Sequence, residues 1–379
     1  MLPAPKPDGL SLADVLESCL AALQGGANRL GLGRVDRAIV LLIDGLGAEA
    51  LRATAGHART LAGALTSRSV IEAGFPTTTA SALASLATGR LPGQHGLVGY
   101  SVLDAAHDRV VNQLSGWDAD LDPATWQLLP TIFERAVQAG IEAVAVGPER
   151  YRNSGFSGAV LRGARYVNGA SIAARMHRAA ELAAAPGAPA LIYVYVPELD
   201  MAAHAHGWQS REWTIALETT DAAVREMAAA LGPRCGLLVT ADHGIVDVPA
   251  RAHVLVDSEP ALLDGVRFIA GEPRCLQLHF ESDLSPGMMA ARLEQWRKAE
   301  SERSWVVSRD ELVASGWLGE VRPEVLPRIG DVIVAARKSI AYYDSRTAGP
   351  QARAMIGQHG SVTQTELRVP LLRFGSFAA

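Results

Sequence analysis

Three short apolar runs, each leading to an acidic side chain, constrain the fold of this 379-residue chain most strongly. The runs span residues 37–43, 191–196 and 236–240. Their length and apolar composition are typical of strands in a parallel sheet that is covered on both faces. Asp44 directly follows the first run, Asp200 stands four residues past the second, and Asp242 comes shortly after the third. Functional side chains of doubly wound α/β proteins lie at such carboxyl ends of strands.

Helical segments alternate with these runs. We predict helices over residues 9–30, 129–140, 171–185 and 213–231, and a further strand over residues 141–146. Strands that alternate with helices in this way favour a parallel sheet with helices on both faces. The sequence therefore predicts an α/β fold, with a doubly wound, mostly parallel sheet sandwiched by helices.

The acidic residues at the strand ends are accompanied by histidines at spacings that suit metal binding. Asp200 and His204 are one helical turn apart, so both can project from one face of a helix. Asp242 and His243 are adjacent and can converge only where the strand breaks into a glycine loop. His359 lies in a loop flanked by glycines. Mixed carboxylate and imidazole ligands favour zinc, with manganese or iron as alternatives.

Thr79 is a candidate nucleophile that precedes a helix of small residues ending near Gly89. A threonine at a helix start is commonly only a cap. The same position also offers backbone N–H groups and the positive end of the helix dipole to a phosphoryl oxygen. A hydroxyl becomes a useful nucleophile when a base or a metal ion lowers its pKa, and the candidate ligands could supply such an ion.

The ordered set of motifs resembles the alkaline phosphatase superfamily, specifically its nucleotide pyrophosphatase/type I phosphodiesterase branch. The matching stretches are residues 41–47, 75–79, 86–89, 95–96, 198–204, 240–244 and 357–360. They cover nearly the whole chain. The resemblance implies an alkaline phosphatase-like fold and a hydrolase that acts on phosphodiester or phosphoanhydride bonds through a threonyl-phosphate intermediate.

The resemblance also implies a ligand set for two Zn2+ ions. One ion would be held by Asp200, His204 and His359. The other would be held by Asp44, Thr79, Asp242 and His243. Counting back from Thr88 and Gly89 places the family's nucleophile at Thr79 and leaves Thr78 as the alternative.

Two positions depart from the family pattern. Relatives that cleave nucleotides carry an aromatic residue directly after the nucleophile, whereas this chain has Ala80. The family commonly has an asparagine shortly after its His-Gly pair, whereas this chain has Tyr100 near that place, either to bind a phosphoryl oxygen or simply to pack. A phosphomonoesterase or a phosphonate hydrolase on the same site is therefore the alternative enzyme. A non-catalytic metal or nucleotide sensor is the remaining alternative.

The net charge bears on the class of substrate, and the cysteines bear on the cellular location. The net charge of -5 is spread without a basic stripe, so we expect a small phosphate ester or nucleotide-like substrate rather than nucleic acid or a membrane. Cys19, Cys235 and Cys275 lack metal or disulfide spacing, which indicates reduced thiols and a cytoplasmic location. Residues 1–8 lack the pattern of a secretory leader. The sequence leaves the oligomeric state open.

Residues 248–345 differ from the rest of the chain in their pattern of predicted strands and helices. Short strands are predicted over residues 267–270, 276–280 and 331–336, with a helix over residues 288–300 that carries Trp296 on its apolar side. We therefore predict a catalytic core formed by residues 1–247 and 346–379, with an inserted α+β cap between them. Arg274 and Tyr343 of this cap are candidates for contact with the substrate, and His95 and His206 are candidates to orient metal ligands.

Overall fold

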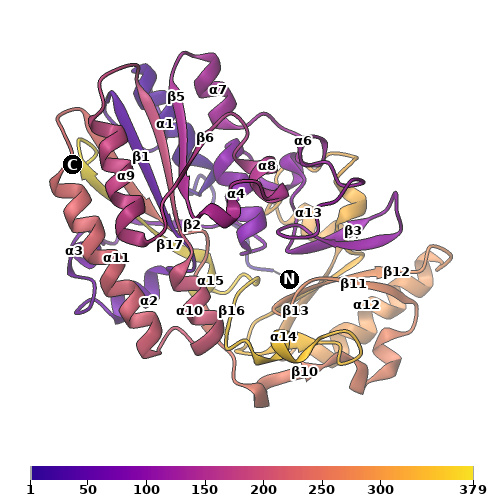
Figure 1. Ribbon diagram of the computed structural model, residues 1–379. Coiled ribbons are helices and arrows are strands. Elements are labelled where there is room, and N and C mark those ends of the chain that lie inside the picture. The colour runs from indigo at the N-terminus through magenta and orange to yellow at the C-terminus, as the bar shows by residue number, and fades with distance from the viewer. Residues whose placement is uncertain (1, 379) are drawn as a thin grey trace.

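A seven-stranded sheet lies at the centre of the protein, whose residues 2–378 are described by the computed structural model (Figure 1). In spatial order its strands are β2 (Val70–Glu72), β17 (Arg368–Gly375), β8 (Cys235–Thr240), β1 (Arg37–Ile43), β7 (Ala190–Val196), β5 (Glu142–Gly147) and β6 (Arg165–Asn168). All run in one direction except β17, which is antiparallel to both of its neighbours. The predicted α/β class with a mostly parallel sheet is confirmed.

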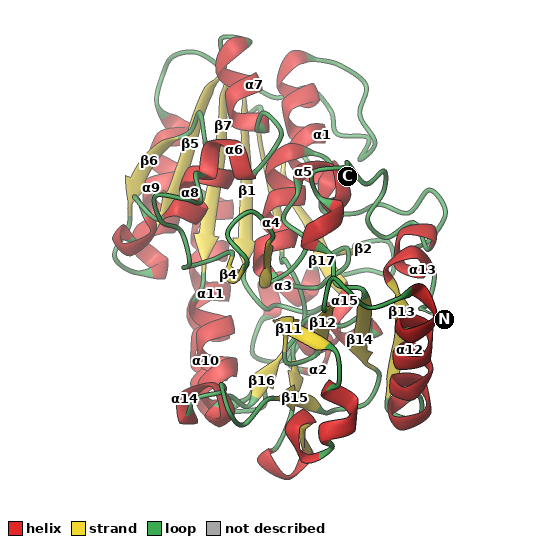
Figure 2. Ribbon diagram, turned by 90° about the vertical axis from the view of Figure 1, so that its right-hand side faces the viewer, coloured by secondary structure: helices red, strands yellow, loops and turns green. Residues whose placement is uncertain are grey.

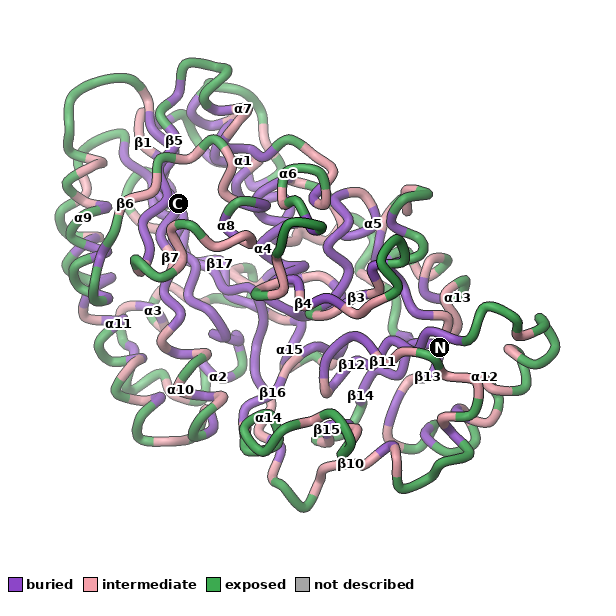
Figure 3. The backbone as a smooth tube through the Cα atoms, turned by 45° about the vertical axis from the view of Figure 1, so that its right-hand side comes forward, coloured by how far each residue is buried: buried purple, intermediate pink, exposed green. Residues whose placement is uncertain are grey.

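The three predicted apolar runs form the middle of this sheet. Strands β8, β1 and β7 are adjacent, and nearly all of their side chains are buried. Figure 3, where buried residues are purple, shows this burial in the middle of the large sheet. The parallel register pairs Ile43 of β1 with Val196 of β7, and Leu42 with Thr240 of β8. The three strands therefore end at the same edge, where the loops that follow them can bring polar side chains together.

Helices cover both faces of the sheet (Figure 2). On one face α1 (Ala13–Gln24), α4 (Thr79–Thr88), α7 (Ile132–Gln138) and α8 (Gly155–Val160) pack on one another and on the strands. On the other face α9 (Ile172–Ala184) and α11 (Arg211–Ala229) pack together, with α3 (Arg59–Gly63) and α10 (Glu198–His206) against α11. The predicted helices at 129–140, 171–185 and 213–231 are confirmed to within a few residues, while the predicted helix at 9–30 is shorter than expected.

A second, antiparallel sheet lies beside the large one (Figure 1). Its strands, in order, are β11 (Val266–Glu272), β12 (Cys275–Phe280), β14 (Val332–Ala336) and β13 (Ser304–Ser308). Two helices, α12 (Pro286–Glu300) and α13 (Arg309–Ala314), pack against it, and Trp296 of α12 is buried as predicted. Buried residues from outside this region, such as Phe75 and Val102, share an apolar cluster with it. The predicted division of the chain into a catalytic core and an inserted cap of residues 248–345 stays a prediction.

Short elements complete the chain. The paired ones are β3 (Ser101–Asp104) with β4 (Arg109–Asn112), β9 (Val246–Asp247) with β16 (Gly357–Gln358), and β10 (His253–Leu255) with β15 (Ala341–Tyr343). The short helices are α2 (Ala48–Ala53), α5 (Pro92–His95), α6 (Pro123–Trp126), α14 (Pro350–Ala354) and α15 (Gln364–Leu367). Among the described residues, no helix combines the length and apolar character needed to cross a membrane. The three cysteines are free, which agrees with the expected reduced thiols, and all three are buried.

A buried ion pair joins the second sheet to the last helix. Arg274, between β11 and β12, donates from Nε and Nη2 to the two carboxylate oxygens of Glu366 at 2.7 and 2.8 Å, and both side chains are fully buried. Its Nη1 donates to the carbonyls of Lys338 and Ile340. The hypothesis that Arg274 contacts the substrate is therefore wrong, because each nitrogen of its guanidinium group donates to a partner within the protein and the side chain is fully buried.

We expect Arg274→Met to lower the free energy of unfolding by about 3–5 kcal/mol, because the substitution leaves the Glu366 carboxylate buried without its partner. Urea unfolding monitored by circular dichroism measures the change. Arg234→Met is the matched control: it removes an ion pair with Asp36 in which both side chains are about half exposed, and should cost less than about 1 kcal/mol. Equal losses in the two variants would contradict this account of the buried pair.

Candidate active site

The loops that follow β1, β7 and β8 meet at one edge of the large sheet. Asp44 directly follows β1, Asp242 and His243 lie just past β8, and Asp200 lies in the first turn of α10 after β7. The backbone N–H of Gly45 donates to Oδ1 of Asp242 at 3.1 Å and so ties the first loop to the third. The strand ends bring these four side chains together from positions up to 199 residues apart in the chain.

Two glycines permit this close approach. Gly45 has a φ of 74°, and a Cβ there would lie 2.7 Å from Ile245 and 3.2 Å from the Cα of Asp200. A Cβ on Gly244 would lie 2.0 Å from the carbonyl oxygen of Thr365. A positive φ strains any residue that has a Cβ, and a backbone contact this close leaves no room for a Cβ. Both positions therefore require glycine. The glycines that accompany the acidic motifs therefore allow the loops to pack against one another.

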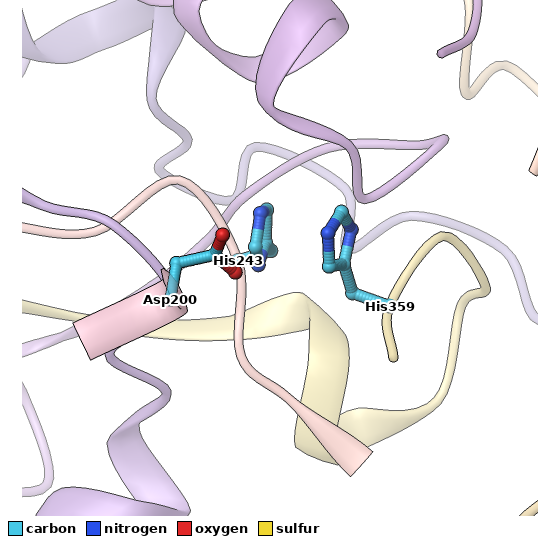
Figure 4. Close-up of side chains that lie close together, drawn as sticks. All are labelled: Asp200, His243 and His359. Carbon is cyan, nitrogen blue, oxygen red and sulfur yellow. The ribbon is translucent and has the colours of Figure 1, made fainter. Parts of the chain in front are cut away.

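The candidate ligands form two overlapping groups. Ligand atoms of Asp44, Asp242 and His243 lie within 4.8 Å of one another, as do those of Asp200, His243 and His359. Figure 4 shows the second group converging, and the rings of His243 and His359 stack with centroids 3.6 Å apart. His204 also lies at the site, with Nε2 3.2 Å from Oδ2 of Asp200. The six predicted carboxylate and imidazole ligands thus lie together, but His243 belongs to both groups.

Thr79 is the first residue of α4, and its hydroxyl lies 3.2 Å from Nε2 of His243. The N-cap position belongs to Thr78, whose side chain makes no capping hydrogen bond. Thr79 therefore does not act as the helix cap, and its side chain is directed toward the candidate ligands. The first turn of α4 also presents backbone N–H groups near the same point.

Each candidate histidine ligand has its second ring nitrogen in contact with a backbone carbonyl. The Nδ1 atoms of His204, His359 and His243 lie 2.7, 2.8 and 3.3 Å from the carbonyl oxygens of Gly357, Thr77 and Gly244, respectively. A proton on Nδ1 would satisfy these contacts and leave the lone pair on Nε2. This arrangement is typical of histidines that bind metals, because the outer hydrogen bond fixes both the tautomer and the ring orientation.

Several carboxylate oxygens at the site are buried without a hydrogen-bond partner. Within residues 2–378, Oδ1 of Asp44, Oδ1 of Asp200 and Oδ2 of Asp242 make no hydrogen bond. Burial and the charges of Asp242 and Asp200 raise the pKa of Asp44 well above its usual range. Burial lowers the pKa of His359 well below its usual range, so that imidazole is neutral and can act as a ligand. A cation would compensate this buried negative charge, so the residues fit a metal site.

Tyr195 of β7 is a site residue that the sequence did not reveal. Its hydroxyl donates a hydrogen bond to Oδ2 of Asp44, which leaves Oδ1 of the same carboxylate free for a ligand. Burial raises the pKa of Tyr195 well above its usual range, so the phenol stays protonated and remains a donor. The one signal in the sequence is the alternation of Tyr193 and Tyr195 within an otherwise aliphatic strand.

We expect Tyr195→Phe to weaken metal binding or activity by about tenfold to a hundredfold, because loss of an outer hydrogen bond releases the orientation of a ligand. Zinc affinity, measured by competition with a chelating dye, checks this directly. Tyr166→Phe is the matched control, because the Tyr166 hydroxyl donates to the carbonyl of Pro148 rather than to a candidate ligand. An unchanged zinc affinity in Tyr195→Phe would contradict the role given to this hydroxyl.

Glu272, at the end of β11, reaches the site from the second sheet. Its Oε2 lies 3.6 Å from Nδ1 of His359, and burial raises the pKa of Glu272 well above its usual range. No feature of the local sequence marks this residue, because it lies in a strand of the predicted cap. Its position behind His359 suits a group that holds the imidazole in place.

Other candidates lie away from the ligands. Tyr100 is 37% exposed and is not part of the cavity beside Thr79, so its role with a phosphoryl oxygen stays a prediction. The hydroxyl of Tyr343 donates to the carbonyl of Ala352 and accepts from Gln358. Both hydrogen bonds are made within the protein, so they give this hydroxyl a structural role. His95 is buried, with Nε2 3.0 Å from the hydroxyl of Ser85, and His206 is exposed at the end of α10.

The fold is that of the alkaline phosphatase superfamily, and the chain belongs to the type I phosphodiesterase / nucleotide pyrophosphatase family, whose profile matches residues 38–362. Membership identifies it as a hydrolase of the phosphodiesterase/pyrophosphatase type. A sequence comparison with curated proteins gives no match.

Solved structures of similar fold include an ectonucleotide pyrophosphatase/phosphodiesterase from two mammals. The murine ectonucleotide pyrophosphatase/phosphodiesterase 5, as an inactive variant in complex with AMP, aligns with a TM-score of 0.68 at 14% identity, over 89% of this chain and 88% of that chain. The human enzyme of the same name gives a TM-score of 0.64 at 15% identity, over 89% and 87% of the two chains. At this level of identity the likeness shows the fold.

Proposed function

We propose that this protein is a two-zinc phosphodiesterase or nucleotide pyrophosphatase that works through a threonyl-phosphate intermediate on Thr79. One observation carries the proposal: three carboxylates, each with a buried oxygen that has no partner, and three imidazoles converge at one edge of the sheet, where His243 lies 3.2 Å from the Thr79 hydroxyl. A purely structural cluster of this kind would leave buried negative charge uncompensated, which is costly. Membership of the type I phosphodiesterase family supports the same reaction.

The donor set matches zinc in its chemistry. Asp44, Asp242 and His243 would hold one ion, with Thr79 beside it. Asp200, His204 and His359 would hold the second, and His243 lies close enough to contribute to either group. When bound, two such ions lower the pKa of a nearby hydroxyl and neutralise charge on phosphoryl oxygens.

The residues of the chain then account for two displacements at phosphorus. In the first, Oγ1 of Thr79 gives up its proton and forms a bond to phosphorus while the bond to the leaving oxygen breaks, and the leaving oxygen takes up a proton. In the second, a water oxygen gives up a proton and forms a bond to phosphorus while the bond to Oγ1 breaks, and Oγ1 takes up a proton, which restores the Thr79 hydroxyl. In this proposal, backbone N–H groups in the first turn of α4 donate to a phosphoryl oxygen in both steps.

A comparison of two esters tests the proposed reaction. The zinc-loaded protein should hydrolyse bis(para-nitrophenyl) phosphate with a higher kcat/KM than para-nitrophenyl phosphate. Faster hydrolysis of the monoester would assign the site to a phosphomonoesterase instead. If neither ester is hydrolysed, the phosphodiesterase proposal is wrong, and a phosphonate substrate or a sensor function is to be tested.

Nucleotide substrates form a separate part of the proposal. The murine structural neighbour binds AMP, which supports a nucleotide-type ester as the first substrate to screen. Ala80 occupies the position directly after Thr79, where an aromatic side chain would stack on a base. We therefore expect nucleotide esters to be hydrolysed without a large preference over simple aryl esters.

A further inference from the structure

Thr77 stands two positions before the proposed nucleophile, and its backbone pairs with the loop that carries His359. Its N–H group donates to the carbonyl of Gly360 at 3.3 Å, and the two residues form an isolated antiparallel bridge. Thr77 is fully buried. The segment that leads into α4 is therefore joined to a loop that lies 283 residues further along the chain.

The side chain of Thr77 pairs with the same loop. Its hydroxyl donates to the carbonyl of Ser361 at 2.6 Å and accepts from the N–H group of Gly360 at 3.0 Å. A threonine hydroxyl has one hydrogen to donate, so the first contact uses its donor and the second uses an acceptor site. Both hydrogen bonds are buried, where the loss of a partner is costly. A valine of nearly the same shape could make neither contact.

The carbonyl of Thr77 contacts His359 itself. Its oxygen lies 2.8 Å from Nδ1 of the imidazole, and a hydrogen bond from Nδ1 to this oxygen fixes the orientation of the ring. Oε2 of Glu272 lies farther from the same nitrogen, at 3.6 Å. The N–H group, the hydroxyl and the carbonyl of Thr77 thus all pair with residues 359–361.

The nucleophile, at the other end of the same segment, contacts a second histidine. The Thr79 hydroxyl lies 3.2 Å from Nε2 of His243. The rings of His243 and His359 stack with centroids 3.6 Å apart and face each other in Figure 4. Residues 77–79 therefore contact one histidine at each end. Since the chain fixes the separation of Thr77 and Thr79, a shift of the His359 loop would also shift the nucleophile.

Thr88, at the far end of α4, shows the contact that an ordinary buried threonine of this helix makes. Its hydroxyl donates at 2.7 Å to the carbonyl of Ala84, four residues earlier in the same helix. This local hydrogen bond is common for a helical threonine, and it joins no second segment to the helix. Thr88 is also buried, so it provides a matched control for the loss of one threonine hydroxyl.

We propose that these contacts form a clamp, in which Thr77 is a positioning residue that holds the nucleophile segment against the loop of His359. The clamp keeps the nucleophile in register with the ion group of Asp200, His204 and His359. The inference rests on the proposed two-zinc site and adds a residue that is neither a metal ligand nor a nucleophile. Thr77 acts through His359 and Thr79 rather than on the substrate.

Zinc binding tests the clamp without any reaction. Thr77→Val keeps the shape of the side chain and removes both hydrogen bonds of the hydroxyl. We expect one of the two zinc ions to bind about tenfold to a hundredfold more weakly, because the His359 imidazole loses its fixed orientation. Competition with a chelating dye measures both affinities. Thr77→Ser keeps the hydroxyl and should bind zinc as the wild-type protein does, and so should the control Thr88→Val.

Two outcomes of this titration would overturn the clamp. One is an unchanged affinity for both ions in a folded Thr77→Val protein. The other is an equal loss in Thr88→Val, because the effect would then belong to any buried threonine hydroxyl of α4. If Thr77→Val does not fold, Thr77→Ser and Thr77→Ala replace it, since they differ only in the hydroxyl. Only the alanine variant should lose zinc affinity, and equal affinities in the two variants would overturn the clamp.

A double-mutant cycle shows whether Thr77 acts through His359. In a His359→Ala protein, adding Thr77→Val should weaken zinc binding by less than about twofold, because the imidazole that Thr77 orients is gone. A residue that only stabilises the fold would instead give losses that add. Additive losses of zinc affinity in the double variant would therefore overturn the clamp.

The clamp also predicts a loss of rate that added zinc does not repair. At saturating zinc, kcat of Thr77→Val for bis(para-nitrophenyl) phosphate should stay about tenfold to a hundredfold below that of the wild-type protein, with a smaller change in KM. The reason is that a small displacement of a reacting group is costly to the rate. Full recovery of kcat at saturating zinc would contradict the coupling between Thr77 and the nucleophile.

Zinc affinity and turnover together separate this proposal from the proposed reaction. If zinc affinity depends on Thr77 as described but no ester is hydrolysed, the reaction assigned to Thr79 is wrong and the clamp stands. If esters are hydrolysed but Thr77→Val equals the wild-type protein in zinc affinity and kcat, the clamp is wrong and the reaction stands.

Discussion

Replacing Thr79 by alanine is expected to lower kcat/KM for bis(para-nitrophenyl) phosphate by roughly three orders of magnitude or more, because loss of a covalent nucleophile removes the first displacement. Zinc content should change little, since five of the six other candidate ligands are fixed by hydrogen bonds or ion pairs that do not involve Thr79. Stopped assays of nitrophenolate release, with metal analysis of the same sample, measure both quantities.

Thr78→Ala is the matched control for this variant. Thr78 is the N-cap residue of α4, one position away, and it is the alternative nucleophile that the sequence left open. Its hydroxyl is buried and makes no hydrogen bond within residues 2–378, so its removal should change activity far less. A large loss in Thr78→Ala with near wild-type turnover in Thr79→Ala would exchange the two assignments.

Removal of the metal is expected to abolish diester hydrolysis and to lower the free energy of unfolding. Without a cation, the carboxylates of Asp44, Asp200 and Asp242 repel one another, and each keeps a buried oxygen without a partner. A ligand present at a thousandfold excess over its Kd stabilises the folded state by about 4 kcal/mol for each site. Dialysis against a chelator, followed by thermal unfolding and assay, should therefore show a lower Tm and no turnover.

Adding back zinc is the control for this experiment. Two equivalents of zinc for each chain should restore both Tm and activity, and manganese should restore them in part if the site tolerates it. In the Asp242→Ala variant, zinc should not restore Tm and activity fully, because Asp242 belongs to one of the two ligand groups. Full activity and an unchanged Tm after verified removal of all metal would contradict the two-zinc proposal.

The sheet could be predicted from the sequence where its strands are buried on both faces. Strands β1, β7 and β8 consist almost entirely of apolar residues, so their composition alone marks them. Strands β2 and β6 were missed because they are short, with three and four residues, and most of their side chains are only partly buried. Strand β17 was also missed, and it is the one antiparallel member of the large sheet.

The candidate site could be predicted where its residues belong to short local motifs. Asp44, Asp200, Asp242, His243 and Thr79 follow strands or begin helices, so the fold class and the resemblance together indicated that they would meet. Tyr195 and Glu272 could not be found in this way, because each reaches the site only through pairing between distant segments. The same holds for the cavity beside Thr79, whose wall combines residues from α4, α8, β5 and β7.

The grouping of the ligands also depends on the folded structure. The resemblance assigned His204, with Asp200 and His359, to one ion and His243 to the other. In the structure His204 lies next to Asp200, but the ring of His243 stacks on that of His359 and belongs to both groups of close ligand atoms. Ring positions of this kind follow from loop packing around Gly45 and Gly244, which spacing in the sequence does not fix.

The stereochemical course at phosphorus tests the central claim most directly. A chiral phosphorothioate diester hydrolysed in isotopically labelled water reports whether one or two displacements occur, even if the intermediate never accumulates. Attack by Thr79 followed by attack of water inverts phosphorus twice, so we expect overall retention of configuration. Inversion would show that water attacks the substrate directly, and would contradict the threonyl-phosphate intermediate.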